Sequence, residues 1–308
     1  MPAIYRFGVG DSPRQRQLAA AVDAVSTVAA PVTVPGADLL WAADWGYGAG
    51  STDTHLTDNN KFDVLASGTV ITIVVTDTEL GSMPAHWPTN MMRVGIAGED
   101  DDMVGFDGTA PWSVPANGEY LWYRMLAYHA GNAWAGGELH NFESNVGSIA
   151  WTFLENSSSG ATFDGGFKTY LGGSGNGTIT SGGHAGFRAS IPTETPLRYV
   201  LGIEKLSSTT VRFHPYIYND STSALLADAD DLVWQDTGGT FAGSTLGEFQ
   251  SGGGLFTHSS ETEMFRSVRI GQQGPVGGGT VTAILYYAGF AVASSNPGTY
   301  VAGEADGF

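Results

Sequence analysis

Aromatic, histidine and carboxylate side chains gather in one stretch of the sequence, residues 119–155. Trp122, Tyr128, Trp134 and Trp151 occur there together with His140, Glu138 and Glu143. Aromatic planes stack against the apolar C–H faces of sugar rings, while histidine and carboxyl groups transfer protons. A binding or catalytic face is therefore to be sought first in this stretch.

Strands must position these side chains, because residues 120–128 alternate with a period of two. One face carries Tyr120, Trp122, Arg124, Leu126 and Tyr128, and the other carries Leu121, Tyr123, Met125 and Ala127. A strand with one solvent-exposed face would show polar residues at every second position, and residues 120–128 do not show them. We predict a central strand covered on both faces, followed by strands at 138–142 and 149–154.

Most of these aromatic residues have a second interpretation, which is that they fill the core of a large β-sandwich. Trp134 differs, because it lies in AGNAWAGG, a loop of small residues with little local core for an indole to enter. We predict glycan binding at Trp134, Trp122, Tyr128, Arg124 and Trp151. A lone histidine such as His140 is more often a hydrogen-bonded core or groove residue than a catalytic base.

Glycine turns divide the rest of the chain into many short strands. The sequence has 44 glycines in 308 residues, clustered as in GGSGNG and SGGG, which predicts an all-β sandwich or barrel. Residues 197–203 and 211–218 are predicted to form a hairpin. Residues 1–37 are predicted to be an arm with one amphipathic helix between Ser12 and Pro31, and residues 38–308 to be the β domain.

Charge and composition exclude several partners. The net charge is −18 with only 13 lysines and arginines, so nucleic acid, anionic membranes and polyuronate glycans are repelled unless a local basic patch overrides the field. The sequence has no cysteine, which excludes disulfides and thiol catalysis. It shows no apolar run of about 18 residues and no signal peptide. We therefore expect cytosolic synthesis and, for a virion protein, release by lysis.

The order of the predicted strands resembles the concanavalin A-like lectin and glucanase superfamily, of which the LamG-type domains are members. Three segments carry the resemblance: KFDVLASGTVITIVV, PLRYVLGIEKLSSTTVRFHPYIYN and RSVRIGQQGPVGGGTVTAILYYAGFAVAS. The resemblance covers most of residues 38–294. It implies a jelly-roll sandwich of two antiparallel sheets.

The glucanases of that superfamily carry Glu-x-Asp-x-x-Glu on one strand. This chain has Glu138, His140 and Glu143 in the corresponding positions, with the histidine in place of the aspartate. Retaining hydrolysis needs two carboxyl groups about 5 to 5.5 Å apart. Residues five apart on a regular strand face opposite sides, so the motif depends on a bulge. A histidine in place of the aspartate alters the charge balance of the motif.

Jelly-roll polysaccharide lyases are a second catalytic template. They abstract a proton beside a uronate carboxylate, using histidine or tyrosine as the base. His140, Tyr128 and Arg124 match those residue types. The net charge of −18 disfavours a uronate polymer, and the Arg- and Gln-containing strand motifs expected of such lyases are missing.

The sequence thus predicts a non-enzymatic attachment protein of an extracellular particle, such as a capsid decoration or tail-associated protein of a bacteriophage virion, with neutral glycans as its expected ligands. It is predicted to be a homo-oligomer that contacts other particle proteins through residues 1–37. No cofactor is expected; the acidic residues 99–102 are predicted to be a solvated loop, with structural calcium as the alternative. A free lectin and a glycan-cleaving enzyme stay open as alternatives.

Overall fold

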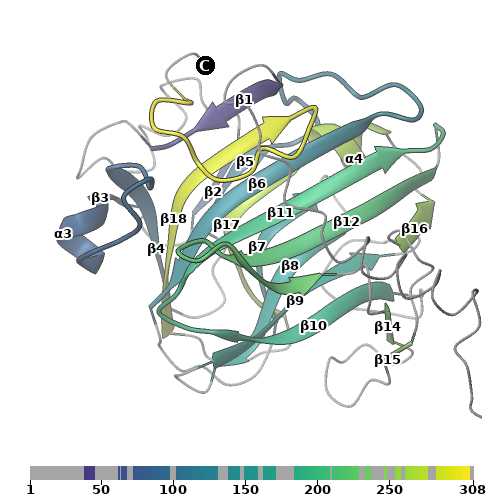
Figure 1. The fold of residues 1–308 in the computed structure, drawn as a ribbon. Coiled ribbons are helices and arrows are strands. Elements are labelled where there is room, and N and C mark those ends of the chain that lie inside the picture. The colour runs from purple at the N-terminus through teal and green to yellow at the C-terminus, as the bar shows by residue number, and fades with distance from the viewer. Residues whose placement is uncertain are drawn as a thin grey trace, which may run out of the picture.

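Figure 1 shows the fold in a computed structural model. The structure describes residues 38–45, 62, 64–67, 72–97, 102–130, 138–145, 149–158, 162–170, 184–208, 210–228, 233–236, 246–247, 254–257, 261–276 and 282–305. The predicted arm and its helix lie outside these residues, so they stay predictions.

The described chain forms two nine-stranded sheets in which all pairings are antiparallel, which confirms the predicted all-β sandwich. Sheet A runs in the order β13 (Ala224–Asp228), β12 (Thr210–Asn219), β11 (Pro196–Lys205), β6 (Tyr120–His129), β18 (Thr282–Ala293), β4 (Asn90–Ala97) and β3 (Thr72–Val75), with β1 (Leu39–Ala43) on β18 and β16 (Gly254–Thr257) on β12. Sheet B runs β15 (Leu246–Gly247), β14 (Val233–Asp236), β10 (His184–Pro192), β9 (Thr162–Tyr170), β8 (Ile149–Ser158), β7 (Glu138–Asn145), β17 (Val268–Val276), β5 (Asp102–Phe106) and β2 (Val64–Ser67).

The core lies between the two sheets and is rich in aromatic rings. Tyr123 of β6 packs against Trp151 of β8, with ring centroids 5.5 Å apart. Tyr199 of β11 meets Phe153 of β8 at 5.2 Å. These contacts fix which face of sheet A is inside, because side chains alternate along each strand. We call the opposite face, turned away from sheet B, the outer face of sheet A.

Strand β6 occupies the central place that its sequence predicts. It pairs with β11 on one side and β18 on the other. The predicted hairpin is also confirmed, with β11 and β12 paired from Leu197 opposite Asn219 to Lys205 opposite Val211.

Two short helices, α3 (Thr76–Leu80) and α4 (Glu261–Arg266), were not predicted. The residue pattern of 265–270 predicts a single strand, but α4 includes Phe265 and Arg266, and β17 begins only at Val268. Carbonyl groups of α4 accept hydrogen bonds from core side chains such as Trp112, and this tertiary contact is invisible to strand periodicity. Neither helix of the described chain is long and apolar enough to cross a membrane.

Candidate functional site

The outer face of sheet A brings together side chains from β6, β11 and β12. On β6 the alternation places Tyr120, Trp122 and Arg124 on this face, since Tyr123 faces sheet B. The register sets Trp122 opposite Gly202 of β11, and Gly202 opposite His214 of β12. The three strands therefore present one row of side chains across the sheet.

Three rings of this face lie next to one another, and we call them the aromatic platform: Tyr120, Trp122 and His214. The rings of Tyr120 and Trp122 are stacked, with centroids 5.9 Å apart and planes 19° apart. Trp122 and His214 are 6.4 Å apart at 28°. All three side chains are half-buried, so the platform keeps contact with solvent while its base is held by the sheet.

A glycine lets the indole of Trp122 lie across the sheet. A Cβ atom added at Gly202 would stand 2.7 Å from the Cη2 and Cζ3 atoms of Trp122, closer than carbon atoms pack. The indole therefore lies directly on the backbone of β11. Any larger residue at position 202 would move the indole.

A charged pair and a second pair of rings border the platform. The guanidinium of Arg212 donates to the carboxylate of Glu204 at 3.1 Å. Burial, and next the Glu204 carboxylate, raise the pKa of Tyr120 above its usual value. Further along β12, Tyr216 and Tyr218 are stacked with centroids 6.0 Å apart.

Arg124, one of the predicted glycan-binding residues, lies on the same face, but its side chain is 0% exposed. Its guanidinium donates two hydrogen bonds to the carboxylate of Glu304 and lies 5.5 Å from the ring centroid of Tyr300. Burial lowers the pKa of Arg124 to about 9, and the nearby Asp220 carboxylate opposes that shift. Arg124 is therefore a charged group covered by another part of the chain.

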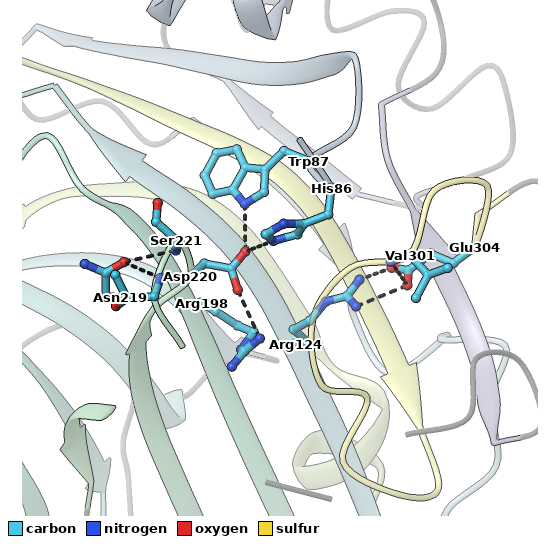
Figure 2. Close-up of polar contacts among 10 residues, drawn as sticks. His86, Trp87, Arg124, Arg198, Asn219, Asp220, Ser221, Val301 and Glu304 are labelled. Atoms are coloured by element: carbon cyan, nitrogen blue, oxygen red, sulfur yellow. Dashed lines mark hydrogen bonds and ion pairs between the residues drawn. The ribbon is translucent and has the colours of Figure 1, made fainter. Parts of the chain in front are cut away.

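A buried carboxylate lies at the end of β12 and contacts side chains of other segments (Figure 2). Asp220, in the turn after β12, accepts hydrogen bonds from the His86 and Trp87 rings at 2.7 Å each. Arg198 of β11 lies 3.0 Å from the second oxygen of Asp220. The segment between α3 and β4 is thereby tied to the turn between β12 and β13.

The other predicted glycan-binding residues are dispersed. Tyr128 lies on the outer face, half-buried, with its ring 6.2 Å from that of Tyr286. Trp151 is 0% exposed and lies between the two sheets, so it is absent from the candidate site. Trp134 falls outside the described residues, and its predicted role stays a prediction.

The structure separates the catalytic candidates from the aromatic platform. Glu138, His140 and Glu143 lie on β7 in sheet B. Glu143 is 0% exposed, and the structure describes only the backbone of Glu138 and His140. The stretch 119–155 is therefore divided between the two sheets and does not form one face. The chain crosses from sheet A to sheet B after β6, which period-two reading within each strand does not reveal.

The residues predicted for lyase chemistry are also divided between the two sheets. His140 belongs to sheet B, whereas Tyr128 and Arg124 face outward from sheet A. The core of the sandwich separates strand β7, which carries His140, from the outer face of sheet A.

Several residues of the site were missed by sequence reasoning. His214, Tyr216 and Tyr218 alternate along β12, and this period of two could have revealed an aromatic outer face. Gly202 and Glu304 carry no comparable signal, because their roles depend on contacts with distant parts of the chain.

The residues that the structure describes include no group of three acidic, histidine or cysteine side chains arranged to hold a metal ion. Of the acidic residues 99–102, only Asp102 is described, as the first residue of β5. Calcium binding at that loop stays an alternative that the structure leaves untested.

Comparisons with known proteins give distant likenesses only. No family model matches the sequence, and no curated protein matches it. A protein of unknown function from Shewanella oneidensis MR-1 is 12% identical with a TM-score of 0.46, covering 97% of this chain and 98% of that one.

Two phage proteins are also similar. The CBM2 module of the evolved Dit of Lactobacillus casei BL23 phage J-1 has a TM-score of 0.33 at 12% identity, covering 84% of this chain and 96% of that one. Tailspike protein 2 of an Escherichia coli O157:H7 bacteriophage has a TM-score of 0.35 at 12% identity, covering 69% of this chain and 24% of that one. At these TM-scores the likenesses carry no argument about what this chain binds.

Proposed function

We propose that this protein is a non-enzymatic carbohydrate-binding β-sandwich and that the aromatic platform is its binding surface. The observation that carries the proposal is the indole of Trp122, which lies against Gly202 and is stacked with Tyr120 and His214. Sugar rings present apolar C–H faces that stack on such planes. Because the rings stand on paired strands, little side-chain entropy is lost when a ligand binds.

The second pair of rings extends the surface beyond one sugar. Tyr216 and Tyr218 lie on β12, two strand spacings or roughly 10 Å across the sheet from β6. They are two and four residues along β12 from His214, which lies in the row of Trp122. On the outer face of β11 between the two strands, Gly202 has no side chain and Val200 is 1% exposed. The expected ligand is thus an oligosaccharide that crosses the strands.

Binding without cleavage is supported by the ionisable groups beside the platform. Glycoside hydrolysis needs two carboxyl groups on either side of the scissile bond. Among the described residues bordering the platform, Glu204 is the carboxylate, and it is already paired with Arg212. The net charge of −18 favours neutral over polyanionic glycans.

Attachment to an extracellular particle is the wider role that we propose for this binding. It rests on the sequence of residues 1–37, whose amphipathic stripe suits an arm that docks on a neighbouring protein. In that role the sandwich recognises glycans and the arm holds it on a virion.

The test is a glycan-binding screen of the full chain, followed by calorimetry with the best neutral oligosaccharide. We expect Trp122→Ala to weaken binding at least tenfold, which corresponds to about 1.4 kcal/mol. Glu79→Gln is the control, because Glu79 of α3 pairs with Arg93 of β4, away from β11 and β12, and this variant should bind as the parent does. A folded Trp122→Ala variant with unchanged affinity, or cleavage of the glycan by the parent, would contradict the proposal.

A further inference from the structure

The segment that follows β18 covers part of the outer face of sheet A. We call residues 296–305 the strap. Figure 2 shows Glu304 of the strap meeting the guanidinium of Arg124. The ring of Tyr300 lies over Gly289, where an added Cβ atom would be 3.4 Å from the ring. The strap thus rests on β6 and β18, beside the aromatic platform.

Side-chain contacts hold the strap down: the ion pair of Glu304 with Arg124, and the ring of Tyr300, which is 4% exposed and belongs to the main core cluster. The Tyr300 hydroxyl donates to the carboxylate of Asp44 at 3.0 Å, and Ala305 packs in a small apolar cluster with Ala42 and Ala291. Residues 301–303 are exposed. Among the described residues, the backbone hydrogen bond that anchors this end of the chain is Ser294 N–H to Asp38, before the strap begins. Such a segment opens at low cost compared with a paired strand.

Beneath the strap lies a site suited to a carboxylate. Arg124 is fully buried, and its Nε atom has no hydrogen-bond partner among the described residues. A buried guanidinium needs an anion to compensate for lost hydration, and its planar fork binds carboxylates with two parallel hydrogen bonds. Glu304 supplies that carboxylate from within the chain.

The other arginines of this face have partners that cannot leave so easily. Arg93 pairs with Glu79 of α3, Arg198 with Asp220, and Arg212 with Glu204. Glu204 belongs to a central strand, and Asp220 is held by two further ring donors. Glu304 differs because it lies on a segment outside the sheets.

We propose that Arg124 is a carboxylate-binding position of the glycan site, occupied by Glu304 until an acidic sugar displaces the strap. This rests on the proposed function, since Arg124 is two residues from Trp122 on the same face of β6. The ligand class is a mostly neutral oligosaccharide with one uronic-acid residue. Its carboxylate replaces that of Glu304 at Arg124, so no unpaired charge is created there.

This ligand class agrees with the acidity of the molecule. Every carboxylate of a polyuronate is repelled by the net charge of −18. A single carboxylate is repelled mainly by charges within about 8 Å, because salt screens the more distant ones at physiological ionic strength. The strap therefore lets a strongly acidic protein accept one acidic sugar while still rejecting a polyanion.

The experiment compares two β-linked tetrasaccharides, one neutral and one with a single glucuronate residue, on the full-length chain. We expect Glu304→Gln to raise affinity for the acidic ligand at least tenfold and to leave the neutral ligand within twofold. Glu79→Gln is the matched control, because it removes a carboxylate paired with another arginine of the same face. It should change neither affinity.

Tyr300→Phe is a second variant, for the case that Glu304→Gln does not fold. It removes the hydrogen bond to Asp44 but keeps Arg124 and Glu304, and we expect a smaller gain that is again confined to the acidic ligand. Equal gains on both ligands, or no gain in a folded variant, would overturn the proposal.

Hydrogen exchange of the strap amides separates this inference from the proposed function. With glucuronate alone as the probe, we expect residues 300–305 of the parent chain to exchange faster as the probe concentration rises, whether or not Trp122 binds glycans. Unchanged exchange, together with unchanged affinities, would show that the ion pair of Arg124 and Glu304 is purely structural. Loss of the Trp122 effect alone would reject only the proposed function.

Discussion

At the scale of single residues, the candidate site depends on the glycine at position 202. The indole of Trp122 lies against the backbone of β11 because position 202 is glycine, and a Cβ atom there would stand 2.7 Å from the indole. The indole is a side chain on a half-exposed surface, so it can tilt away without disturbing the sheet.

This arrangement predicts the effect of Gly202→Ala. The variant keeps every aromatic ring but tilts the indole of Trp122, so neutral oligosaccharide binding should fall at least fivefold. Unfolding free energy should change by less than about 1 kcal/mol, because the sheet gains strand propensity as it loses the stacked contact. Calorimetry measures the oligosaccharide affinity, and urea unfolding measures the unfolding free energy. Unchanged binding would mean that the orientation of the indole is unimportant.

A buried histidine should make stability depend on pH. His129 is 1% exposed and meets the ring of Phe163 edge-on at 5.2 Å. Burial lowers the pKa of His129 to about 4, whereas an unfolded histidine titrates near 6.5. The unfolded state therefore binds the proton first as pH falls. The resulting loss of stability begins near pH 6.5 and is complete near pH 4.

The size of this effect follows from the difference in pKa. At pH 5 the parent should have lost about 2 kcal/mol relative to pH 7 through this residue. His129→Leu should lack that component, so its unfolding free energy should fall less between pH 7 and pH 5. Urea unfolding at both values gives the comparison. If the unfolding free energy falls equally in parent and variant, folding does not lower the pKa of His129.

At the scale of elements, Asp220 joins three segments that are far apart in the sequence. It accepts from His86 and Trp87 in the segment before β4 and pairs with Arg198 of β11. Its side chain is fully buried and that of Arg198 is 4% exposed. Removing one member of such a buried pair leaves the other charge without compensation.

Asp220→Asn should therefore destabilise the fold by about 3 to 5 kcal/mol. Glu79→Gln is a suitable comparison, because the Glu79 and Arg93 side chains are 28% and 37% exposed and exposed pairs contribute about 0 to 1 kcal/mol. Denaturant unfolding of both variants measures the difference. Similar small losses in both would mean that water reaches Asp220.

At the scale of the whole molecule, the sandwich and the arm are predicted to act separately. Residues 38–305 contain both sheets and the aromatic platform, whereas residues 1–37 are predicted to make contacts with other proteins. A chain lacking residues 1–37 should keep its unfolding midpoint within a few degrees and its glycan affinity, but lose self-association and attachment. Analytical ultracentrifugation and calorimetry test this. A truncated chain that associates like the parent would reject the arm as the attachment element.

The sequence alone determined the fold class and the central strands. Strand periodicity predicts β6, β11 and β12 closely, because alternation along a strand is a local property that each residue carries with it. For the same reason the sequence placed Trp122, Arg124 and Tyr128 on one face of β6.

Only the tertiary structure decided which strands share a sheet and what covers each face. Two neighbouring strands in the sequence, β6 and β7, lie in different sheets, so the aromatic and carboxylate residues of the 119–155 stretch are divided. The strap has no periodicity, yet Glu304 reaches Arg124 across 180 residues of sequence. Such contacts depend on the path of the whole chain. Local pattern determines which way a side chain points, and only the assembled sheets determine what it meets.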